Sequence, residues 1–396
     1  MTAHQNPSSV AESHPSELSS VSASPIAQTI LGAALMIPGL GNLHAQSLPE
    51  HASLNLSYLH YQESQSDLKR VGATSPSLQL ILPVAGTWLL DGTLTSDNVS
   101  GASPRYHSAV SGASRMSDHR KAADLTLSRF FERGSIAAGM SYSNEHDYKS
   151  RAISFSAAIN SADKNTSFNF GIGDSQDDIN PSNKVVRNEH KSSKNMMIGI
   201  SHIFTPVDIV QLSLSHGRGT GYFSDPYKFP DNRPRTRNQS NAALRWNHHI
   251  EQAESTLRLS YRYYRDSFAI KAHTFQLEIE KELSHEWSFT PSMRFYTQSA
   301  ASFYVDPIYD ATLGAPFPPG FRFDRQQLIS ADHRLSGFGA ITLGAKFSKQ
   351  LSAQWQVDFK FERYEQRGQW RAFHKGSPGL MPLTANIVQF GLSKQW

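Results

Sequence analysis

The sequence predicts an all-β fold, a single antiparallel transmembrane β-barrel of about sixteen strands. Three observations lead to it. From residue 52 onward, apolar residues recur at every second position. The segments that connect these alternating stretches are short and long in turn. The last stretch alternates Val388, Phe390 and Leu392, and the chain then ends on an aromatic residue, Trp396.

The period of two is clearest in the second half of the chain. Leu257, Leu259 and Tyr261 alternate with Arg258, Ser260 and Arg262. In a strand, these two sets point to opposite faces, one suited to lipid and the other to water. The expected strands are 52–63, 75–82, 87–96, 121–131, 135–144, 150–160, 165–173, 194–204, 208–217, 240–250, 256–265, 270–281, 287–298, 335–348, 355–366 and 385–396.

The connections between these strands test the prediction independently. Short ones include Pro83–Gly86, Glu132–Gly134, Ala162–Asn165, Thr205–Val207, Glu251–Ser255, Ser284–Glu286 and Lys349–Gln354, and long ones include 97–120, 174–193, 218–239, 299–334 and 367–384. Outer-membrane barrels have short periplasmic turns and longer outer loops, and an even strand count brings both barrel ends to the periplasmic side. The alternation therefore favours a membrane barrel over a soluble β-sandwich.

The composition excludes several classes of protein. The chain has 396 residues, no cysteine and a mean hydropathy of −0.45. It therefore has no disulfide, thiolate metal site or cysteine nucleophile. After residue 45 there is no run of 18 apolar residues, which excludes a helical membrane protein. The formal charge of +4 is too small to indicate a nucleic-acid partner.

We expect residues 1–45 to be a disordered leader and signal peptide, and residues 46–396 to form the barrel. An apolar run, 26–40, precedes the small-residue cleavage site Leu43-His44-Ala45. The leader contains no Lys or Arg, which departs from an ordinary signal peptide and leaves a buried apolar helix as the alternative. Export through a signal peptide predicts the outer membrane of a Gram-negative type of cell.

The alternation also predicts which charges face the lumen. The inward set is Arg245, Arg258, Arg262, Arg294, Lys346 and Lys360, with Asp91, Asp124, Glu278, Glu280, Asp358 and Glu362. The six positive and six negative charges cancel, so any pore should be weakly ion-selective. A hairpin centred on Phe268 places Arg258 opposite Glu278, since a one-residue slip would put Arg258 into lipid.

Two partners are expected besides outer-membrane lipid. Arg233, Arg235 and Arg237 fall in an outer loop, where guanidinium groups suit the phosphates of lipopolysaccharide. The terminal strand ending in Trp396 resembles the signal that barrel-assembly machinery reads.

No catalytic, cofactor or metal site is predicted. Asn247-His248-His249 reads as barrel wall near an interface, because no serine stands in the short His-x-Ser arrangement of barrel phospholipases. The acidic run 174–180 has calcium-like ligands but lacks the glycine and distal glutamate of a hand-type loop. Glu145-His146-Asp147 and Asp118-His119 have transition-metal ligand types, at a spacing that 17 histidines also produce by chance.

From about residue 50 to its end, the chain resembles an uncharacterised family of exported bacterial proteins, domain of unknown function 3570 (DUF3570). The stretches that carry the resemblance include Val99-Ser-Gly-Ala-Ser-Pro-Arg105, Gly221-Tyr-Phe-Ser-Asp-Pro-Tyr-Lys228, Asp231-Asn-Arg-Pro-Arg235, Ser260-Tyr-Arg-Tyr-Tyr-Arg-Asp-Ser-Phe268, Pro316-Phe-Pro-Pro-Gly320 and Arg363-Tyr-Glu-Gln-Arg-Gly368. The resemblance implies an exported, barrel-forming protein without an established activity or known catalytic residues.

A sixteen-stranded barrel leaves an aqueous lumen unless loops fill it. The leading interpretation is therefore a porin-like channel or passive transport pore of unknown solute, and not an enzyme. The alternative is a surface enzyme or a plugged binding or assembly barrel that uses loops 97–120, 218–239 and 299–334.

Overall fold

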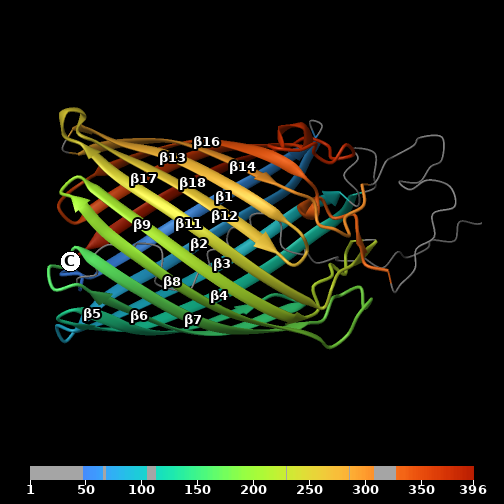
Figure 1. Cartoon of the computed structure of the whole chain (residues 1–396), viewed down its shortest axis with the longest axis horizontal. Helices are drawn as coiled ribbons and strands as arrows, with labels where there is room; N and C mark the ends of the chain where they lie inside the picture. Colours follow the sequence, from blue (N-terminus) through green and yellow to red (C-terminus); the bar gives the residue numbers. More distant parts are fainter. Residues whose placement is uncertain (1–47, 66–67, 105–112, 229, 285, 307–326) are drawn as a thin grey trace, which may run out of the picture.

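The computed structural model describes residues 48–65, 68–104, 113–228, 230–284, 286–306 and 327–396. Sixteen antiparallel strands form one closed barrel in the order β1-β18-β17-β16-β14-β13-β12-β11-β9-β8-β7-β6-β5-β4-β3-β2. Figure 1 shows the tilted strands, with short turns at the end that holds the C-terminus and the longer connections at the opposite, outer end. The predicted all-β barrel and its strand count are confirmed.

Every predicted strand is present, and the bounds of the sixteen are as follows. The first eight are β1 (Ser53–Gln65), β2 (Leu68–Val84), β3 (Trp88–Pro104), β4 (Ala113–Phe131), β5 (Gly134–Asn144), β6 (Tyr148–Asn160), β7 (Thr166–Ile179) and β8 (Glu189–Thr205). The others are β9 (Asp208–Gly221), β11 (Thr236–Ile250), β12 (Ser255–Asp266), β13 (Lys271–Ser284), β14 (Trp287–Gln298), β16 (Phe338–Gln350), β17 (Trp355–Arg367) and β18 (Leu383–Gln395).

The outer face of the wall is apolar because the strand register places the apolar residues of neighbouring strands opposite one another. Between β12 and β13, for example, Leu259 lies opposite Leu277, and Tyr261 lies opposite Phe275. Phe275 is 48% exposed, as a lipid-facing side chain should be in the isolated protein. No helix in the described part of the chain is both long and apolar enough to span a membrane.

The barrel closes between its first and last strands. Leu56 lies opposite Leu392, and Tyr58 lies opposite Phe390. Two backbone hydrogen bonds of 3.1 Å join Ala52 to Trp396, one in each direction. Closure leaves no strand of the barrel with an unpaired edge, which a lipid environment requires.

Tryptophans and basic residues lie together at the end of the barrel that holds the C-terminus. The Arg129 guanidinium lies 5.4 Å from the ring centre of Trp88, and Lys349 Nζ lies 4.9 Å from that of Trp287. Lys394, which breaks the apolar phase of the last strand, has its Nζ 5.2 Å from the Trp355 ring. Such aromatic rings belong at the level of the lipid headgroups.

Three of the expected long loops are partly strand. The pairing of β3 with β4 continues through most of 97–120, and β7, β8, β9 and β11 extend likewise into 174–193 and 218–239. The sequence pattern does not predict these extensions, because no lipid contacts them. The outward face of the outer part of β7 carries Asp174, Gln176 and Asp178, so the alternation that marks a membrane strand is lost while backbone pairing continues.

Candidate functional site

The predicted lumen charges share one face of the wall. The register places those of β11 to β14 in four cross-strand rows, and one of these rows contains Asn247, Arg258, Glu278 and Ser292. Arg258 lies opposite Glu278, as the hairpin argument predicted. Its ion pair, however, is with Glu280, two residues along β13, because a long arginine side chain reaches the diagonal position.

The remaining charges of the predicted set lie on the same inner face. On β17, Asp358, Lys360 and Glu362 follow one another at every second position, and Lys360 Nζ lies 3.0 Å from Glu362 Oε1. Lys346 lies opposite Lys360 on β16. Across the barrel, Gln79 Nε2 donates a hydrogen bond of 3.0 Å to Asp91. Asp124 lies on β4, opposite Thr93.

The lumen is hollow at the level of these charges. The strand register turns Arg245 and Arg262 toward the inside of the barrel, yet both residues are exposed. A guanidinium that points away from lipid can be exposed only to water inside the barrel. The lumen therefore contains solvent beside β11 and β12.

The outer mouth, by contrast, is crossed by folded loops. We call residues 222–228, 230–235, 299–306 and 327–337 the outer cap. It contains the short sheet β10 (Asp231–Asn232) paired with β15 (Ile329–Ser330), and the 3-10 helix η2 (His333–Leu335). Figure 1 shows these connections at the outer end of the barrel.

An apolar cluster attaches the outer cap to the turn between β12 and β13. Phe268, at the tip of that turn, is 1% exposed and packs with Ile270, Ala301, Phe303 and Leu335. Its ring centre lies 5.0 Å from that of Phe303, in an edge-to-face arrangement. Burial of a phenylalanine contributes about 1.5–3 kcal/mol, so this cluster fixes one side of the cap.

A buried ion network holds the two loops of the outer cap together. Arg233 Nη2 lies 2.7 Å from carboxylate oxygens of both Asp231 and Asp332. Arg334 also pairs with Asp332, and its Nη2 lies 2.6 Å from Asp225 Oδ2. Burial alone would raise the pKa of Asp332, but the attraction of Arg334 and Arg233 outweighs it and holds that pKa well below its ordinary value.

The cap reaches the far wall of the barrel. Lys228 belongs to the β9–β11 connection, whereas Glu63 lies on β1, eight strands away from β9 in the barrel order. The two side chains are nevertheless close enough for each charge to shift the pKa of the other. Burial raises the pKa of Glu63 to about 7, with Tyr61, Lys228 and Arg70 opposing that rise.

Other outer loops hold the cap as well. The Tyr227 hydroxyl donates a hydrogen bond of 2.7 Å to Asp147, between β5 and β6, and accepts one of 2.9 Å from the Ser182 amide, between β7 and β8. The Gly379 amide, between β17 and β18, donates to Asp306 Oδ2 at 2.8 Å. The cap therefore contacts loops all around the mouth.

The predicted lipopolysaccharide contacts need correction for two of the three arginines. Arg233 is buried in the ion network, and its side chain is 10% exposed. Arg237 faces the lumen by register and pairs with Asp266 at 2.6 Å. Both are occupied by carboxylates, so they are not available to lipid phosphate. Arg235 has a side chain that is 58% exposed, and it pairs with Glu189.

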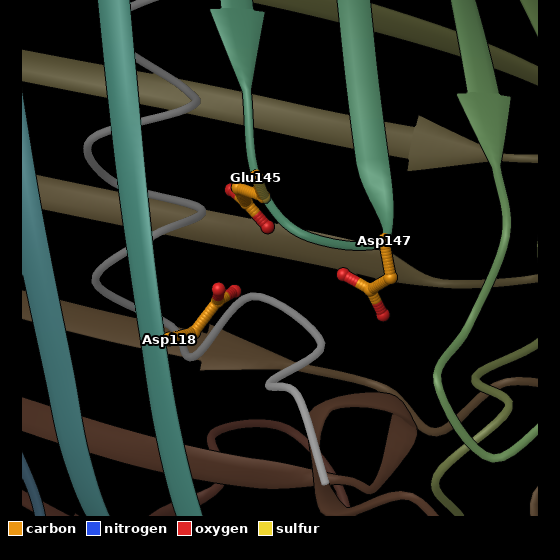
Figure 2. Close-up of side chains that lie close together, drawn as sticks. All are labelled: Asp118, Glu145 and Asp147. Carbon is orange, nitrogen blue, oxygen red and sulfur yellow. The ribbon is translucent and has the colours of Figure 1, made fainter. Parts of the chain in front are cut away.

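Three carboxylates meet beside the cap. Asp118, at the outer end of β4, lies with Glu145 and Asp147 so that one oxygen of each is within 4.8 Å of the others (Figure 2). Burial, and then repulsion by Asp118, raises the pKa of Glu145 to about 8. Carboxylates this close either share a proton or bind a hard divalent cation. In the sequence these carboxylates stand next to two histidines, His119 and His146. Both histidines are exposed, and neither belongs to the group of three.

The other sequence motifs are structural in the described residues. Trp246 Nε1 donates to Asp208 Oδ1 at 2.8 Å, and His248 Nδ1 lies at the same distance from that oxygen. The acidic run after Gly173 is not a loop but the outer half of β7. There Asp177 turns inward, whereas Asp174 and Asp178 turn outward, so their carboxylates cannot converge on one calcium ion.

Sequence reasoning named the two loops of the cap as part of a possible plug, but it did not predict that they pair with each other. The one signal of that pairing was charge complementarity between two distant loops, with Asp225, Asp231 and Arg233 in one and Asp332 and Arg334 in the other. Nothing in a single sequence pairs those loops with each other.

The family can now be stated. Residues 112–393 match the model of a family described as protein of unknown function (DUF3570). The chain belongs to this family. No curated protein matches the sequence.

Several solved structures are similar in fold. "Bacterial polysaccharide outer membrane secretin" is 8% identical with a TM-score of 0.49, over 87% of this chain and 98% of that chain. "CymD monoaromatic hydrocarbon channel" is 9% identical with a TM-score of 0.42, over 87% and 88%. A Pseudomonas aeruginosa FadL homologue is 11% identical with a TM-score of 0.40, over 87% and 90%. Likeness at this level carries no argument about function.

Proposed function

We propose that the protein is a passive channel of the outer membrane for small hydrophilic solutes, with an outer entrance narrowed by the cap. The observation that carries this proposal is the solvent-exposed, inward-facing pair Arg245 and Arg262 below a buried cap. A barrel of this size keeps a water-filled lumen without any moving part. A buried ion network across its mouth restricts which solutes can enter. The proposed path runs past the cap and along the charged wall.

The outer membrane and two partners belong to the same proposal. The last strand, ending at Trp396, is the segment that barrel-assembly machinery would recognise. Lipopolysaccharide phosphate would contact exposed Arg235 and a neighbouring depression of about 470 Å³, whose basic lining residues are His146, Lys184 and Arg187. Loss of lipopolysaccharide that co-purifies with the protein, in a variant combining Lys184→Gln, Arg187→Gln and Arg235→Gln, tests that contact.

Conductance in a planar bilayer tests the channel. The wild-type protein should show small, steady single-channel currents. Arg334→Gln should show larger and more frequent openings, because removing one partner from a buried ion pair costs about 3–5 kcal/mol and should loosen the cap. Arg235→Gln is the matched control, since it removes an exposed arginine of the same cap and should leave the currents unchanged.

A second candidate is a plugged barrel that binds a ligand on its outer loops. The observation that favours it is the number of loops that the cap joins, from β1 to the β17–β18 connection. The same recordings separate the two. If the wild-type and Arg334→Gln proteins are both silent, while the unboiled barrel still migrates as a folded species on a denaturing gel, the channel is excluded.

A further inference from the structure

Three lumen arginines stand apart from every ion pair of the described residues: Arg245 on β11, Arg262 on β12 and Arg294 on β14. The other inward-facing arginines of these strands are paired, Arg258 with Glu280 and Arg237 with Asp266. The Nε–H of Arg294 donates to Gln276 Oε1 at 3.1 Å, and Arg262 reaches Thr274 Oγ1 only at 3.5 Å. A guanidinium group carries five N–H donors, so each of the three has donors to offer.

The register gathers these arginines into a triangle. One cross-strand row runs from Arg245 through Ser260 and Gln276 to Arg294. Arg262 lies in the next row outward, opposite Thr274. With strands about 4.8 Å apart and a rise of about 3.3 Å per residue, the arginine Cα atoms are separated by about 8–15 Å, a span that two long side chains can close. We call this group the arginine triangle.

The floor of the arginine triangle is small and hydrogen-bonding. Ser260 and Thr274 are hydroxyl residues that leave space above the wall, and Gln276 places an amide between them and Arg294. The closest acidic side chain on the floor is Glu278, which accepts a hydrogen bond of 2.6 Å from Gln276 Nε2. Asp124 lies on β4, eight strands from β13 and so on the opposite wall.

We propose that the arginine triangle binds an oxyanion, the carboxylate or phosphate group of a solute in transit. Planar guanidinium groups present paired N–H donors that match such groups, and the hydroxyl floor supplies further contacts. This inference rests on the proposed channel and names the solute class as small organic or phosphorylated anions. The net charge of the predicted lumen set is zero, so the site binds anions locally without making the whole pore anion-selective.

Citrate and inorganic phosphate are the probes. Potassium chloride current through the wild-type channel should fall in a saturable way as either probe is added, and calorimetry on the detergent-solubilised barrel should show the same binding. Arg262→Gln and Arg294→Gln should each weaken the apparent affinity by about tenfold or more, the loss expected for a charge-assisted hydrogen-bonded contact. Tighter binding of one probe separates carboxylate from phosphate as the natural group.

Lys346→Gln is the matched control. It removes one positive charge from the same lumen, on the adjacent strand β16 opposite Thr290 and so outside the two rows of the arginine triangle, and should leave block and heat of binding within about twofold of wild type. If Lys346→Gln weakens binding as much as Arg262→Gln does, the effect is general lumen charge and the site does not exist. A conducting channel without block or binding heat overturns the site alone, whereas a silent wild-type barrel that binds citrate overturns the channel and keeps the site.

Discussion

Two stretches of the barrel wall, β5 to β9 and β11 to β17, which we call its neutral and charged halves, differ on the inside and agree on the outside. From β5 to β9 the inward positions are mostly small and neutral, such as Ser141, Gly173 and Ser213. From β11 to β17 they carry most of the lumen charges. The outward positions are apolar in both halves, as Phe155 and Leu259 show.

This difference teaches which residues the fold needs. Lipid sets the same requirement on every strand, so the outward face cannot distinguish the halves. The inward face has no such requirement, because small neutral side chains suffice to keep β5 to β9 in place. The charges from β11 to β17 are therefore the part of the wall that function, and not folding, explains.

The largest expected effect tests that shared outer requirement. Leu259→Arg and Phe155→Arg, one in each half, should each cost about 2–4 kcal/mol, because an arginine would face the middle of the bilayer. Ser260→Arg and Ser156→Arg, the inward neighbours, should cost less than about 1 kcal/mol. Urea unfolding in lipid vesicles measures all four. A similar cost at Ser260 and Leu259 would contradict the assignment of the two faces.

How far the sequence predicts the molecule follows from the same contrast. Membrane strands were predictable because alternation such as Leu257, Arg258, Leu259 is imposed by lipid on one face and water on the other. The outer halves of β3, β4 and β7 were not, because polar residues on both faces remove the alternation. The hairpin register of Arg258 was predictable from lipid avoidance, but its choice of Glu280 depends on side-chain reach.

The outer cap was the least predictable part. Arg233 in a loop sequence looks like any exposed arginine, and its burial depends on Asp332, 99 residues away. The triad Asp118, Glu145 and Asp147 was visible only as two separate pairs, since two strands must be in register before the carboxylates meet. Contacts between distant loops leave no periodic pattern in a sequence.

The second prediction concerns pH and contrasts the two sides that support the cap. Glu63 on β1 and Glu145 in the β5–β6 turn have pKa values raised to about 7 and about 8. While the cap is folded, these two carboxyls keep their protons up to about pH 7 to 8, whereas after the cap opens they lose them from about pH 4.5. The stability of the folded cap should therefore fall as the pH rises toward 8. Asp332, whose pKa is lowered, contributes stability that is lost only in acid.

Limited trypsin digestion of the cap and channel open probability should both increase from about pH 6 to about pH 9. Glu145→Gln and Glu63→Gln should flatten the rise, because neither amide titrates. Asp163→Asn, in an exposed periplasmic turn, is a control that should leave the profile unchanged. A cap that becomes more resistant as pH rises would show that these carboxyls are not the titrating groups.

The third prediction concerns ion selectivity. The six basic and six acidic side chains of the predicted lumen set should leave the wild-type channel with a small reversal potential in a salt gradient. Asp124→Asn should move the permeability ratio toward anions and Arg262→Gln toward cations, each by about two- to threefold, because a single charge is screened within about a Debye length. Shifts of the same sign would mean that the two walls do not contribute to one pathway.

The smallest expected effect concerns the ion pair Arg258–Glu280 and what sets the register of the charged half. A double-mutant cycle with Arg258→Gln and Glu280→Gln should give a coupling of about 0.2–1 kcal/mol, since both side chains are about a third exposed to a wet lumen. A one-residue slip of the same hairpin would instead turn Arg258 into lipid at about 2–4 kcal/mol. Lipid avoidance therefore sets the register, and the pair adds to it.

The double variant carries the sharper consequence. With both charges removed, the β12–β13 hairpin should keep its register, because Leu257, Leu259 and Tyr261 still need the lipid face. A disulfide between cysteines placed at Leu259 and Leu277, which lie opposite each other, reports that register and should form equally well with and without the ion pair. If it forms only when Arg258 and Glu280 are both present, the ion pair decides the register, and the charges of this half are needed for folding after all.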